Sequence, residues 1–188
     1  MHATGLATIA YYYFDFRDIK KQDLYGLLSS LVSQLSEVDP CLKVLSQLYL
    51  VHGRGARKPT TSTLTKCMKD MLSMPGLGPI YIIVDAVDEC PDVSGMPSST
   101  REEVLRLFEE LVGLKLSNLH LCVASRPEIG IRKTLEPLEP LQISLHDESG
   151  QRDDIVQYIK SVVRKMWSWR DEDKELAIEV LSGKAAGM

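Results

Sequence analysis

The sequence predicts an α/β protein in which helices flank a parallel β-sheet. Short apolar runs alternate along the 188 residues with longer segments that repeat apolar residues every three or four positions, and this alternation is typical of the α/β class. One run, Ile80 to Val84, is too short for a helix and too apolar for a strand that faces water. We therefore expect it to be a central strand with both faces covered.

Four apolar runs have the length and composition of β-strands. They are short, rich in branched or aromatic residues, and bounded by turn-forming or polar residues, which favours strands over helices. The predicted strands are Leu6 to Phe14, Ile80 to Val84, Leu119 to Ala124 and Leu141 to Leu145.

Helical patterns fill most of the sequence between and after these runs. In the clearest, from Leu24 to Leu35, leucine and valine recur at spacings of three and four and form one apolar stripe. Thr100 and Glu103 form a capping-box pair at the start of another. The predicted helices cover residues 24–35, 40–50, 61–72 and 100–113, a segment that begins near Ser149, and residues 171–181.

The composition excludes several functional classes. Charged residues make up 26% of the chain and the net charge is −4, so we expect neither nucleic acid nor a membrane surface as a partner. The four cysteines lie far apart with no CxxC pair, as is typical of reduced intracellular thiols. No apolar stretch is long enough to cross a bilayer, and we expect a cytoplasmic protein.

Three carboxylates follow the run from Ile80 to Val84, namely Asp85, Asp88 and Glu89. Ligands of open α/β sheets bind at the carboxyl ends of strands, and Mg²⁺ prefers one or two carboxylates together with phosphate oxygens. Asp85 is therefore the candidate metal ligand, and Asp88 and Glu89 are candidates for orienting or deprotonating a water molecule. The alternative is that all three are solvated loop acids.

A second polar pair, Ser125 and Arg126, follows the run from Leu119 to Ala124. The planar guanidinium group suits phosphate oxygens. An isolated arginine after a strand is more often part of a surface ion pair. Beside an acidic strand end, however, Ser125 and Arg126 are better explained as a sensor of nucleotide phosphates.

Four segments carry a resemblance to a known family. They are YYYFDFRD (11–18), IIVDAVDEC (82–90), CVASRPE (122–128) and SLHDESGQRDDIV (144–156), and they resemble the NACHT-type, nephrocystin-like P-loop domain of fungal signal-transducing NTPases. The resemblance implies a sheet of the STAND/AAA-like P-loop type with strand order 5-1-4-3-2, and a switch driven by Mg²⁺ with ATP or GTP.

The resemblance also implies roles and boundaries. It makes Asp85 the Walker B magnesium ligand, Asp88 and Glu89 the acids around the hydrolytic water, and Ser125 with Arg126 the sensor. It implies a partial NTPase core over residues 1–147 and the start of a helical subdomain over 148–188. In family terms the chain begins at the second strand, so we expect the first strand and the P-loop to be missing.

The phosphate-binding motif of that family, GxxxxGK[ST], occurs nowhere in the chain. The cluster from His52 to Pro59 lacks a glycine directly before Lys58, and we interpret it as a solvated loop. Losing three or four charge-assisted hydrogen bonds costs about 5–10 kcal/mol, whereas a micromolar site is worth about 8 kcal/mol. We therefore expect this chain to bind nucleotide weakly or not at all, and whether it is an enzyme stays open.

Two other functions compete with a partial NTPase domain. A non-catalytic interaction module, descended from such a domain, would bind a protein partner or a second copy through the helix face of Leu24 to Leu35 or through an open sheet edge. A metal-dependent phosphohydrolase would use Asp85, Asp88 and Glu89 without a P-loop.

Overall fold

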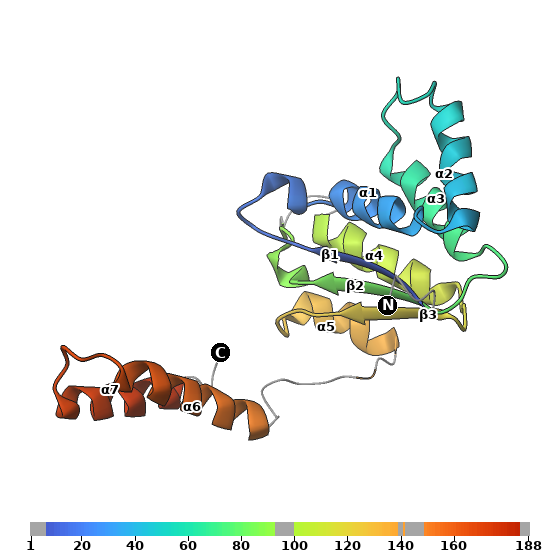
Figure 1. The fold of residues 1–188 in the computed structure, drawn as a ribbon. Coiled ribbons are helices and arrows are strands. Elements are labelled where there is room, and N and C mark those ends of the chain that lie inside the picture. The colour runs from blue at the N-terminus through green and yellow to red at the C-terminus, as the bar shows by residue number, and fades with distance from the viewer. Residues whose placement is uncertain (1–6, 93–99, 139–140, 142–148, 185–188) are drawn as a thin grey trace. The chain divides into compact units, whose positions relative to one another are not determined.

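The computed structural model describes residues 7–92, 100–138, 141 and 149–184, and the chain divides into two compact units, residues 1–140 and 141–188. Unit 1 contains a parallel sheet with helices, and unit 2 contains a pair of helices (Figure 1). The main elements are β1 (Thr8–Tyr13), α1 (Leu24–Leu35), α2 (Asp39–Val51), α3 (Thr61–Leu72), β2 (Ile80–Asp85), α4 (Thr100–Gly113), β3 (Leu119–Val123), α5 (Ile129–Leu135), α6 (Ser149–Arg164) and α7 (Asp171–Lys184). Short 3₁₀ turns cover Ile19–Lys21, Val87–Glu89 and Glu136–Leu138.

The described strands form one parallel sheet of order β1-β2-β3. Ile80 of β2 lies opposite Thr8 of β1 on one side and opposite Leu119 of β3 on the other. Parallel neighbours need long crossovers, which are supplied here by α1 to α3 and by α4. The predicted α/β class and the parallel sheet are confirmed, whereas most of the fourth predicted strand, Leu141 to Leu145, lies outside the described residues.

The core lies between one face of the sheet and the crossover helices. Ala10, Ile82 and Val84 point into it from the strands and are completely buried. The apolar stripe of α1 is also buried there, so the hypothesis that this helix face binds a partner is wrong. Its members, each at most 3% exposed, are Leu27, Leu28, Leu31, Val32 and Leu35.

The opposite face of the sheet is uncovered within the described part of unit 1. Tyr11, Tyr81 and Ile83 are 59%, 40% and 39% exposed, so the prediction that both faces of β2 are covered is wrong for these residues. The strand order explains the result. Successive strands add in one direction, and right-handed crossovers then place both connections on the same face of the sheet, where α1 and α4 lie (Figure 1).

The outer edge of β1 is partly closed by one side chain. The Gln34 side-chain amide accepts a hydrogen bond from the Tyr11 backbone N–H at 3.0 Å and donates one to the Tyr11 carbonyl at 2.8 Å. It thus occupies two of the outward-facing backbone groups that another strand would use. Unpaired edges invite association with other chains, and Gln34 blocks this edge at its centre.

Unit 2 consists of α6 and α7, which pack against each other. Val163 and Ile178 are buried between them at 3% and 6% exposure. Among the residues that the structure describes, no helix has the length and apolar character needed to span a bilayer.

Candidate functional site

The acidic segment after β2 is held by a short, tightly bonded turn. Ala86 adopts a left-handed conformation with φ of 56°, which redirects the chain into the 3₁₀ turn Val87–Glu89. The side chain of Val87 is fully buried, and its N–H donates to the Ala124 carbonyl at the end of β3. The turn is therefore anchored both to the core and to the neighbouring strand end.

Asp88 joins the carboxyl ends of β2 and β3. Its side chain is only 9% exposed, and its Oδ1 accepts a hydrogen bond from the Arg126 backbone N–H at 3.0 Å. The Ser125 hydroxyl lies 3.3 Å from the same oxygen, and Arg126 Nε lies 3.4 Å from Oδ2. Three of the predicted site residues, Asp88, Ser125 and Arg126, thus form one connected group.

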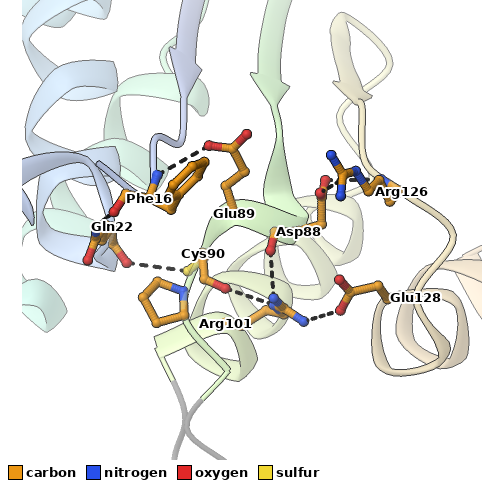
Figure 2. A pocket seen from close by; sticks show the side chains of 9 residues that line it. Phe16, Gln22, Asp88, Glu89, Cys90, Arg101, Arg126 and Glu128 are labelled. Carbon is orange, nitrogen blue, oxygen red and sulfur yellow. Dashed lines mark hydrogen bonds and ion pairs between the residues drawn. The ribbon is translucent and has the colours of Figure 1, made fainter. Parts of the chain in front are cut away.

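Glu89 and Asp85 lie apart from that group. Glu89 Oε2 accepts a hydrogen bond from the Phe16 backbone N–H at 3.2 Å, so this carboxylate faces the end of β1 (Figure 2). Asp85 is exposed on the same face of the sheet as Tyr81 and Ile83, and its Oδ1 accepts from the Ala86 N–H at 2.8 Å. Asp85, Asp88 and Glu89 lie within five residues of sequence, but their side chains have different partners.

Arg101, near the start of α4, binds the acidic turn from below in the view of Figure 2. This residue is 8% exposed. Its guanidinium donates to the Cys90 carbonyl at 2.9 Å and to the Asp88 carbonyl at 2.7 Å, and it forms an ion pair with Glu128. Because Glu128 is the N-cap residue of α5, Arg101 connects the turn after β2 to the segment after β3.

A cleft of about 420 Å³ opens between these segments. Asp88, Glu89 and Arg126 line it, whereas Asp85 and Ser125 do not. The other residues that line it are Phe16, Gln22, Cys90, Pro91, Arg101 and Glu128.

The thiol at the base of the cleft is not a reactive group. Burial raises the pKa of Cys90 to about 12, and its Sγ lies 3.4 Å from the Gln22 carbonyl. A thiol with so high a pKa stays protonated at neutral pH and is a poor nucleophile. Cys90 thus helps to hold the segment before α1 against the acidic turn.

The arrangement offers charged groups rather than a finished metal site. The exposed Asp85 carboxylate and the guanidinium of Arg126, whose side chain is 83% exposed, are free to meet a ligand. In the described ranges, no three or more histidine, cysteine or acidic side chains are grouped so that they could hold a metal ion. A cation at Asp85 would therefore need further oxygen ligands from the molecule it accompanies.

Sequence reasoning missed Arg101 and Glu128. Arg101 stands at the polar start of an amphipathic helix, where charged residues are normally solvated, and its main partners are backbone carbonyls that leave no trace in a sequence. The one available signal was the position of Glu128 two residues after Arg126, close to the second predicted strand end.

Comparison with known proteins gives one family. The model of the family described as nephrocystin 3, N-terminal, matches residues 2–126. The match covers all three strands and the five predicted site residues. Neither the search of curated proteins nor the search of solved structures found a match.

Proposed function

Since this chain belongs to the nephrocystin 3 N-terminal family, we propose that it is the part of a NACHT-type nucleotide switch, as in fungal signal-transducing NTPases, that holds Mg²⁺ and senses phosphate. In this proposal the exposed carboxylate of Asp85 binds the cation. Arg126, oriented by Asp88 and Ser125, contacts the terminal phosphate of ATP or GTP. Glu89 orients the attacking water, which requires it to leave Phe16 when the nucleotide binds.

The observation that carries the proposal is the connection between the two strand ends through Asp88. Its nearly buried carboxylate holds Ser125 and Arg126 beside the turn that follows Asp85. A phosphate placed outside this edge would meet a carboxylate for its cation and a guanidinium for its oxygens, which is the recurring requirement of phosphoryl-transfer sites.

The proposal includes the absence of the phosphate loop. A GxxxxGK[ST] segment supplies several backbone N–H groups and a lysine to the phosphates, and this chain contains none. We expect the 188 residues alone to bind nucleotide with a dissociation constant of about 1 mM or weaker, equivalent to about 4 kcal/mol. Tight binding and hydrolysis belong to a form in which that loop is present.

The test compares two proteins by calorimetric titration with ATP or GTP, with and without Mg²⁺. One protein is the present chain, and the other is the chain joined to a segment that carries a strand and GxxxxGK[ST]. The longer protein should bind nucleotide in a Mg²⁺-dependent way, and Asp85→Asn should remove the Mg²⁺ dependence while leaving the fold intact by circular dichroism. Asp70→Asn, a change of an exposed acid on α3, serves as the control. Mg²⁺-dependent binding that survives Asp85→Asn would refute the proposal, as would no binding by the longer protein.

A further inference from the structure

The hairpin of α2 and α3 carries an apolar groove far along the chain from the acidic turn. The groove has a volume of about 490 Å³. Leucines at positions 42, 45 and 48 of α2 line one side, Leu64 of α3 lines the other, and Arg57 and Pro59 of the connecting loop close one end. All of these residues belong to unit 1.

Helix α2 has much more apolar surface than its packing uses. Cys41 is its only buried residue, whereas Leu42, Tyr49 and Leu50 are 48%, 53% and 60% exposed. Contiguous exposed apolar surface of this kind marks interaction sites in soluble proteins. It extends beyond the groove along the helix, so a small molecule in the groove would leave much of it in water.

The loop between the two helices is exposed to solvent, as predicted for His52 to Pro59, and its backbone forms a folded turn. Gly53, Arg54 and Gly55 all have positive φ angles. The Arg54 N–H donates to the Tyr49 carbonyl at 2.9 Å, and the Arg57 N–H donates to the His52 carbonyl at 3.1 Å. A Cβ atom on Gly55 would come within 3.1 Å of the Tyr49 ring. The loop therefore holds Arg57 in a defined place at the end of the groove.

The charge of this hairpin differs from that of the chain. From Asp39 to Leu72 the hairpin contains six lysines and arginines and two carboxylates, Asp39 and Asp70, and thus has a net charge of +4 in a chain whose net charge is −4. Lys66 and Lys69 form ion pairs with Asp70 and Glu110, and Lys58 lies over the ring of Tyr25. Within the described part of the chain, Arg54 and Arg57 form no ion pair. Arg57, which lines the groove, and Arg54, three residues earlier, are therefore available to the carboxylates of a partner.

We propose that this groove binds an acidic amphipathic helix of another protein. An α-helix of about 13 residues is about 20 Å long, so α2 can accompany two to three turns of a partner whose apolar residues recur at i, i+3 or i+4 and i+7. Leucine-sized side chains of the partner fill the groove, and carboxylates on its flank meet Arg57 and Arg54. A bilayer fits less well, because the apolar side chains line a concave surface that a flat lipid interface does not enter.

The experiment uses the 188-residue chain and two fluorescein-labelled helical peptides of about 14 residues, measured by fluorescence anisotropy. Both peptides have leucines at i, i+3 or i+4 and i+7. One carries glutamates at the remaining positions, and the other carries lysines. The glutamate peptide should bind at least about tenfold more tightly than the lysine peptide, a difference of about 1.4 kcal/mol, and added salt should weaken its binding.

Matched substitutions locate the binding. Leu42→Glu and Arg57→Glu, both in the groove, should each weaken binding of the glutamate peptide about tenfold or more. Ile129→Glu and Lys133→Glu likewise replace an apolar and a cationic residue by an acid, at exposed positions of α5, and should leave binding unchanged. Circular dichroism checks that all four variants keep the fold.

Four results would overturn the proposal. The first is equal affinity for the two peptides, and the second is no binding of either. In the third, neither peptide binds, but the chain binds vesicles that contain phosphatidylserine, and Leu42→Glu abolishes this binding. That result would assign the groove to a membrane. In the fourth, neither peptide binds, but sedimentation shows that the chain self-associates and that Leu42→Glu abolishes the self-association. That result would mean that a second copy of the chain occupies the groove.

Discussion

Asp88 occupies a nearly buried position where the ends of β2 and β3 meet. Its carboxylate is nearly buried and accepts hydrogen bonds from the segment after β3, whereas Asp85, three residues earlier, is exposed. Removing this carboxylate would leave those donors without an acceptor. At the residue scale, Asp88 therefore holds Arg126 in place, while the Asp85 carboxylate and most of the Arg126 side chain are exposed.

Arg101 is expected to stabilise the turn that carries Asp88. Arg101→Leu removes donors to two backbone carbonyls and to Glu128, and we expect it to lower the free energy of unfolding by about 1–3 kcal/mol. Glu128 is partly exposed and can be solvated, which keeps the loss from being larger. Urea denaturation measures the effect, with Arg106→Leu at an exposed position of the same helix as the control. Equal losses in the two variants would contradict this account.

The cysteines should differ sharply in reactivity. Cys41, Cys67 and Cys90 are buried and Cys122 is exposed, and burial raises the pKa of Cys67 to about 11 and that of Cys90 to about 12. Only Cys122 should react with iodoacetamide in the folded chain at about pH 8, because the thiolate is the reacting form. Mass spectrometry identifies the modified residue, and modification of Cys90 before unfolding would contradict the prediction.

The same groups predict a loss of stability at alkaline pH. Thiols and tyrosines in the unfolded chain lose their protons near their ordinary pKa values of 9.0 and 10.0, whereas burial raises the pKa of both Cys90 and Tyr12 to about 12 in the folded chain. The unfolded state thus binds fewer protons in this window, and the free energy of unfolding falls as the pH rises from about 9 towards 12. Urea midpoints measured across the window should decline, and the decline should be smaller in Cys90→Ala. A midpoint that does not change with pH would contradict the prediction.

At the scale of elements, the outer edge of β1 is partly occupied by a side chain from a neighbouring helix. One edge of the strand pairs with β2, and the other is occupied at Tyr11 by the side chain of Gln34 from α1. The amide of glutamine has a donor and an acceptor like those of a peptide group. A single residue of the crossover helix thus takes the place of part of a neighbouring strand.

Gln34→Ala should weaken this edge. Loss of two hydrogen bonds to the backbone of Tyr11 should cost about 1–2 kcal/mol and accelerate hydrogen exchange of the Tyr11 amide. Native-state exchange measured by NMR reports both effects. Gln47→Ala on the exposed side of α2 is the matched control. An unchanged exchange rate at Tyr11 would show that Gln34 does not protect the edge.

Elements with a strong apolar period could be predicted well from the sequence. The bounds of α1 and α3 agree with their apolar stripes, and β2 was visible as an uninterrupted branched run. The exposure of Tyr81 and Ile83 could not be predicted, because an apolar strand carries no record of which segment covers it. The local sequence likewise did not reveal that Gln34 would reach β1.

The candidate site could be predicted in part for the same reasons. Adjacent parallel strands end at one edge, so the closeness of Asp88 to Ser125 and Arg126 followed from the order of the strands. The separation of Asp85 from Glu89 depends on the left-handed conformation of Ala86, which is unusual for alanine. Arg101 acts mainly through backbone carbonyls, and these are the same in every sequence.

At the scale of the whole molecule, the buried core belongs to unit 1. Its apolar cluster extends from Ala10 to Ile131, whereas Val163 and Ile178 are the buried apolar residues described in unit 2. A pair of helices with so few buried side chains gains little from the hydrophobic effect. The two units should therefore contribute unequally to cooperative unfolding.

A chain that ends after Pro140 should keep a cooperative thermal transition close to that of all 188 residues. The separate segment 141–188 should show only gradual loss of helix on heating. Circular dichroism as a function of temperature measures both transitions. Loss of cooperativity in the shorter chain would show that residues 141–188 are part of the folding unit.

The two hydrogen bonds between the Gln34 side chain and the Tyr11 backbone make the two outer edges of the sheet unequal. With the outer edge of β1 occupied at Tyr11, an added strand should pair more readily with the outer edge of β3, next to Ser125 and Arg126. A separately produced polypeptide that carries such a strand should therefore bind along β3 and enlarge the sheet on that side. The side chain of Gln34 therefore favours one flank of the sheet over the other for the addition of a strand.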